Sequence, residues 1–165
     1  MELFGSALLF WLVILLGLYS VGGIIVMRSP SLRLRSIGHR LGMDTVQLMQ
    51  FKDQPRWLWA AVQQKAVESF ILLCHRTRTF ATKVRGDSPD PYYVRARLEA
   101  LVATGTPTIP ALRQLKVILV GDLYGPELAK EHRREWGALQ KELFFLGIAV
   151  LAIEDCRKQL KLPTP

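Results

Sequence analysis

The chain has 165 residues, 50% of them hydrophobic, and carries a net charge of +8. This length suits one ordinary domain rather than several. The sequence contains none of the GxxxxGK, GxGxxG, HExxH or GxSxG motifs, which excludes the enzyme and nucleotide-binding classes that those motifs mark.

The chain begins with a long apolar run. Residues 3–27 contain no Asp, Glu, Lys, Arg or His. As a helix, these twenty-five residues would extend about 37 Å, more than the roughly 30 Å hydrocarbon core of a bilayer. The run lacks the basic leading region and small-residue exit of a cleaved signal peptide. A buried soluble helix seldom carries so long an uncharged run. We therefore expect residues 1–28 to form an uncleaved transmembrane anchor.

Positive charge follows the apolar run directly. Residues 28–90 contain eleven Lys and Arg against five Asp and Glu, whereas residues 91–165 contain eleven against eight. The arginines before the first acidic residue of this segment, Asp44, are Arg28, Arg33, Arg35 and Arg40. By the positive-inside bias, we expect the amino terminus outside and the remaining chain in the cytoplasm or its organellar equivalent. These arginines are expected to contact lipid headgroups, which lie next to the anchor. Nucleic acid is the less favoured partner for the same charge.

Small side chains recur within the apolar run. Gly17, Ser20 and Gly23 are spaced by three residues and would lie along one face of a helix. Such a strip allows a second helix to approach closely, although the strict GxxxG spacing is absent. The strip predicts a membrane protein partner, and a plain tether is the alternative.

Residues 29–52 form a basic amphipathic juxtamembrane segment. Ser29 and Pro30 can start a helix, and Leu34, Ile37 and Leu41 recur on one face. This face could rest on lipid headgroups or dock on the domain that follows.

Residues 53–165 are predicted to form a small helical bundle. Helices are expected at about 54–85, 90–103 and 108–120, followed by a last helix that starts near residue 125. Most of these starts combine a capping residue with proline, and glycine follows three of the ends. The last helix carries an apolar stripe formed by Trp136, Leu139, Leu143, Leu146, Val150, Ile153 and Leu160. This pattern of helix starts, helix ends and apolar spacing predicts a mostly α fold.

An α/β fold is the competing interpretation. Residues 116–121 and 148–153 are apolar runs, each followed by carboxylates, and could be two strands of a βαβ unit at 116–155. A parallel sheet would need more strands than the sequence offers.

Few residues suggest chemistry. Asp122, Glu154 and Asp155 form a weak alternative metal site that requires the strand reading. Cys74 and Cys156 lie far apart without ligand spacing, which predicts two buried structural thiols. No cofactor is expected.

These features together predict a membrane-anchored accessory, assembly or scaffolding subunit rather than an enzyme. The alternative is a membrane-tethered enzyme or ligand sensor with a carboxylate site near Asp122 and Glu154.

Overall fold

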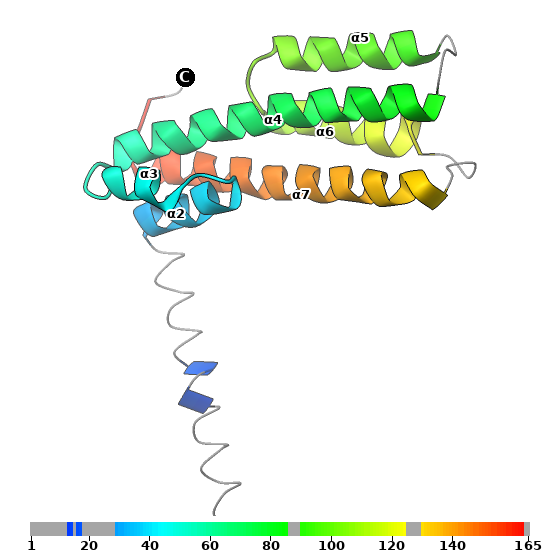
Figure 1. Ribbon diagram of the computed structural model, residues 1–165. Helices are drawn as coiled ribbons and strands as arrows, with labels where there is room; N and C mark the ends of the chain where they lie inside the picture. The colour runs from blue at the N-terminus through cyan, green and yellow to red at the C-terminus, as the bar shows by residue number, and fades with distance from the viewer. Residues whose placement is uncertain (1–12, 15, 18–28, 86–89, 125–129, 164–165) are drawn as a thin grey trace, which may run out of the picture.

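The computed structural model describes residues 13, 14, 16, 17, 29–85, 90–124 and 130–163 (Figure 1). These residues form helices and no strand, which confirms the mostly α prediction. The elements are α2 (Pro30–Arg40), α3 (Thr45–Gln50), α4 (Pro55–Arg85), α5 (Asp90–Ala103), α6 (Ile109–Val117), the π-helix η1 (Ile118–Asp122) and α7 (Lys130–Gln159).

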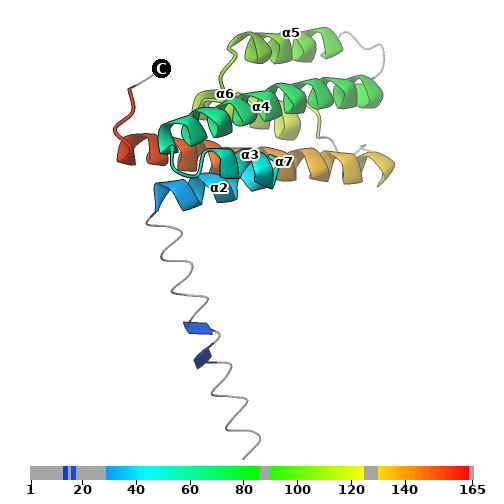
Figure 2. The ribbon, with the colours of Figure 1, turned by 60° about the vertical axis from the view of Figure 1, so that its left-hand side comes forward.

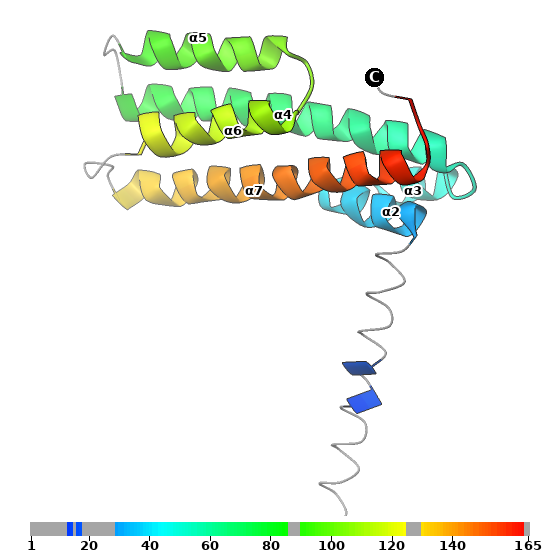
Figure 3. The same cartoon turned by 180° about the vertical axis from the view of Figure 1, so that it is seen from behind.

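The two longest helices, α4 and α7, lie side by side and run in opposite directions. Helix α5 packs on α4, and α6 packs against α7 and α5 (Figures 1 and 2). Helices α2 and α3 lie beneath one end of this pair, where α2 contacts both α4 and α7 (Figure 3). The domain is thus a helical bundle built around one antiparallel pair.

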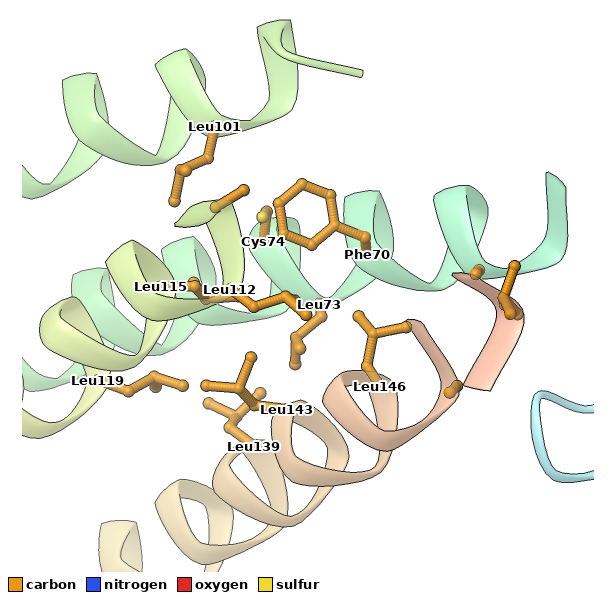
Figure 4. Close-up of a cluster of buried hydrophobic side chains, with 14 of the residues drawn as sticks. Phe70, Leu73, Cys74, Leu101, Leu112, Leu115, Leu119, Leu139, Leu143 and Leu146 are labelled. Carbon is orange, nitrogen blue, oxygen red and sulfur yellow. The ribbon is translucent and has the colours of Figure 1, made fainter. Parts of the chain in front are cut away.

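The core follows the predicted helical periodicity. One face of α4 is buried at Leu58, Val62, Ala66, Phe70 and Leu73, and α7 buries Leu139, Leu143, Leu146 and Ile153. Leucines of α5 and α6 meet these side chains in the cluster drawn in Figure 4. Each large side chain that is fully buried contributes about 1.5–3 kcal/mol of hydrophobic free energy. Packing of amphipathic faces therefore holds the helices together.

Two indoles tie α7 to its neighbours through backbone carbonyls. Trp59 Nε1 of α4 donates to the Ile153 carbonyl at 3.0 Å, and Trp136 Nε1 of α7 donates to the Leu119 carbonyl at 2.8 Å. Both bonds satisfy a polar group in half-buried surroundings, where an unpaired N–H would be costly. By contrast, the neighbouring Trp57 is 65% exposed.

The strand interpretation of residues 116–121 and 148–153 is wrong. The first run completes α6 and continues into η1, where the Leu123 N–H donates to the Ile118 carbonyl five residues back, at 3.0 Å. The second run lies inside α7. Both runs are mostly apolar because they bury one helical face and also expose large apolar residues on another. Continuous apolarity does not distinguish such a helix from a buried strand.

Helix α2 docks on the bundle by its apolar face. Leu34 and Ile37 are buried in the same core as α4 and α7, so the docked alternative describes the structure. The sequence pattern does not predict the short helix α3. This helix is capped by the Asp44 side chain, which accepts a hydrogen bond from the Val46 N–H, and it buries Leu48. Residues 29–52 therefore belong to the same core as the helices that follow.

The predicted anchor lies mostly outside the described residues. Residues 13, 14, 16 and 17 are helical, and the rest of 1–28 is not described. Within the described part of the chain, the helix that is long and apolar enough to cross a membrane is residues 132–159 of α7. The uncharged run within it, between Glu142 and Glu154, has eleven residues, about 17 Å of helix, which is shorter than the roughly 30 Å hydrocarbon core. The packing of α7 on α4 explains its apolar length as that of a helix in the bundle. The N-terminal anchor stays a prediction.

Candidate interaction surface

Asp122 sits at the end of η1 between two arginines. Arg97 Nη1 of α5 lies 2.6 Å from an Asp122 carboxylate oxygen, and the Arg85 guanidinium of α4 donates to the Asp122 backbone carbonyl. Both arginines therefore fasten the end of η1 to α4 and α5. A carboxylate held in this way is a structural contact rather than an open ligand.

The other two carboxylates of the weak metal site also have arginine partners. Glu154 pairs with Arg157 at 2.6 Å, and the hydrogen bond from that guanidinium holds the pKa of Glu154 below its usual value. Asp155 pairs with Arg33 of α2.

The structure does not bring Asp122 and Glu154 together. Trp136 contacts the π-helix that ends at Asp122, and Glu154 lies eighteen residues further along α7, about 27 Å by helical rise. Among the described residues, no three His, Cys, Asp or Glu side chains gather as metal ligands would. The geometry therefore does not assemble the carboxylate site on which the enzyme alternative depends.

The described juxtamembrane arginines occupy different environments. Arg33 is engaged with Asp155, and Arg35 donates to the Lys52 carbonyl at 3.2 Å. Arg40 is exposed at the end of α2 and forms no ion pair with a described residue. Arg28 lies outside the described residues, so headgroup contact by these arginines stays a prediction. Of the predicted small-residue strip, Gly17 is exposed with open space around its Cα, whereas Ser20 and Gly23 are not described.

A groove opens where α2 ends between α4 and α7. Its volume is about 560 Å³, and we call it the α2–α4–α7 groove. The lining residues are Arg40, Leu41, Ser69, Leu72, Leu73, Arg76, Glu142, Phe145 and Leu146. Leu72 and Phe145 are 59% and 43% exposed, so apolar surface lies open to solvent along the groove.

Three charged side chains line the groove. Arg76 pairs with Glu142 across α4 and α7, while Arg40 stands at the end of α2. Apolar side chains beside Arg40 suit an amphipathic helix that carries apolar residues at helical spacing and an acidic residue for Arg40. The sequence offered a weak signal for this surface, because Leu72 and Phe145 are large apolar residues outside the buried periodic faces.

Both thiols are buried, as the sequence predicts. Burial raises the pKa of Cys74 to about 12 and also raises the pKa of Cys156. Since the thiolate is the nucleophile, we expect neither cysteine to react measurably with iodoacetamide at pH 8 in the folded chain. Both should react in denaturant, as measured by the mass added to each tryptic peptide. Rapid native alkylation of Cys74 would contradict the packing of α4.

Comparison of the chain with protein families, curated proteins and solved structures gives no match. The candidate surface is therefore assigned from the geometry and chemistry of this chain.

Proposed function

We propose that this protein is a membrane-anchored accessory, assembly or scaffolding subunit that binds a partner protein at the cytoplasmic face of a membrane, or its organellar equivalent. The N-terminal apolar run supports the anchor, and the arginines after it support the orientation. The observation that carries the proposal is the α2–α4–α7 groove, which exposes Leu72 and Phe145 beside the helix that follows the anchor.

The occupant that suits this groove is an amphipathic helix of the partner. A helix buries residues spaced by three and four in such a groove, and Arg40 would pair with an acidic residue at its edge. The small-residue strip at Gly17, Ser20 and Gly23 offers a second contact, within the membrane. In this proposal, the domain supplies specificity and the anchor raises the local concentration of the partner.

The test is a pull-down of the tagged full-length chain in a gentle detergent. We expect a partner in constant proportion to the chain, lost when Leu72→Glu places a charge in the groove. Val117→Glu is the matched control, because Val117 is 54% exposed on α6 and lies outside the groove. Loss of the partner in both variants would indicate a general effect on folding, which circular dichroism would detect.

A third variant distinguishes binding through the groove from binding through the small-residue strip. Changing Gly17, Ser20 and Gly23 to leucine fills the predicted strip without touching the groove. A partner that disappears only with this variant would move recognition to the anchor. A chain that purifies alone in all four forms would overturn the proposal.

A further inference from the structure

Helix α7 exposes a second set of large apolar residues, beside the groove residue Phe145. Phe144, Ile148 and Leu151 are 66%, 43% and 59% exposed, and we call them the outer stripe. Their spacing of four and three places them along one line of the helix. The other sides of α7 are covered by α2, α4 and α6. The outer stripe thus lies on a side of α7 that the described helices leave open.

The outer stripe leads to the point where the apolar N-terminal run joins the bundle. The next position on the same line is Asp155, which pairs with Arg33 near the start of α2. Cys156 Sγ lies 3.8 Å from the Pro30 carbonyl oxygen, beside the first residue of α2. Asp155 lies eleven positions after Phe144, about 17 Å along the helix. If the run that ends at Met27 crosses a membrane, the end of the outer stripe nearest Asp155 lies close to the lipid.

Basic side chains flank the outer stripe. Arg113 and Lys116 of α6 line a cavity of about 330 Å³ against Phe144. On the other side, Lys141 Nζ lies 6.0 Å from the centre of the Phe145 ring. Long basic side chains can cover apolar surface while their charged ends reach lipid phosphates. Aromatic and aliphatic residues bordered by lysine and arginine are typical of helices that lie in a membrane interface.

We propose that the outer stripe rests in the boundary between headgroups and acyl chains of an anionic membrane, so that α7 lies along the bilayer surface. The inference rests on the proposed anchor, which brings the domain to the membrane. It adds a second lipid contact and fixes which side of the bundle faces the bilayer. The α2–α4–α7 groove begins beside the stripe at Phe145 and extends to Leu72 of α4, and its α4 side then stays accessible to a partner protein.

The test uses the full-length chain in vesicles of equal parts phosphatidylcholine and phosphatidylserine. A polarity-sensitive nitrobenzoxadiazole label is attached to Ile148→Cys or, in a separate sample, to Leu72→Cys. Leu72 is the matched control because it is an exposed leucine of the groove. Cys74 and Cys156 are buried, and mass spectrometry verifies one label per chain. Lipids brominated high on their acyl chains serve as quenchers.

We expect the label at position 148 to be quenched severalfold more than the label at position 72. Leu151→Cys provides an independent second position on the outer stripe and should behave like position 148. Equal, weak quenching at all three positions in chains that float with the vesicles would overturn the proposal. A blue-shifted emission at position 148 that is insensitive to brominated lipid and disappears on dilution would assign the stripe to a second copy of the chain. Failure of the chain to float with vesicles would instead overturn the anchor itself.

Discussion

Replacing Phe70 with alanine should bring the bundle close to unfolding. Phe70 is completely buried on α4, in the cluster where α4, α5, α6 and α7 meet (Figure 4). Removal of its ring loses transfer free energy and leaves a cavity, at a cost of about 3–5 kcal/mol. Since domains of this size have about 5–15 kcal/mol of stability, the loss is a large fraction of the total. Urea unfolding of the full-length chain in detergent, followed by circular dichroism, should show a midpoint lower by roughly 2 M.

Leu72→Ala is the control for this prediction. Leu72 lies two residues further along α4 but is 59% exposed, so its truncation should change the free energy of unfolding by less than about 0.5 kcal/mol. The contrast tests the register of α4. Similar midpoints for the two variants would mean that α4 does not turn its Phe70 face toward the core.

Replacing Gly38 with valine should detach α2 from the bundle. A Cβ on Gly38 would lie 2.7 Å from Leu48 Cδ2, 3.1 Å from Met43 Sδ and 3.3 Å from Val62 Cγ2. Valine adds two further methyl groups in this space, which costs about 1–3 kcal/mol in a packed site. Hydrogen exchange of the α2 and α3 amides should become much faster, while the amides of α5 and α6 keep their protection.

Two other substitutions show whether packing is the cause. Gly38→Ala gains about 1 kcal/mol of helix propensity. It requires the end of the Leu48 side chain to move and smaller shifts of Met43 and Val62, so we expect a small net effect. Gly147→Ala in α7 places its Cβ in open space and should stabilise the domain by up to about 1 kcal/mol. Equal destabilisation by alanine and valine at position 38 would point to the backbone of α2 instead.

The sequence predicts local features of this fold well. Proline starts, glycine ends and apolar periodicity locate α4 and α5 within one residue, and they identify the buried face of α7. These signals are local, because a cap or an apolar face depends on residues within two turns. The continuous runs at 116–121 and 148–153 misled because their two apolar sides have different roles, one in the core and one exposed.

Contacts between distant residues could not be predicted from the sequence. Asp122 follows an apolar run in the sequence, but its partner Arg97 lies twenty-five residues earlier. This pair forms only when the end of η1 lies beside α5. Glycine has a low helix propensity, so Gly38 by itself indicates a less stable position in a helix. In the structure, its missing side chain lets α2 approach Leu48 and Val62. The groove and the outer stripe likewise depend on which sides of α7 its neighbours cover.

The contact between α2 and α7 joins two segments that the ribosome makes far apart in time. Arg33 and Asp155 are separated by 122 residues, so at about 5–20 residues per second α2 waits roughly 6–24 s for its partner helix. During this interval Leu34 and Ile37 lack the α7 surface that later helps to bury them. A basic amphipathic helix whose apolar face is still uncovered is suited to lie on the nearest anionic bilayer. The two sequence-based interpretations of residues 29–52 would then describe successive stages in the synthesis of one chain, with completion of α7 as the step that releases α2 from the lipid.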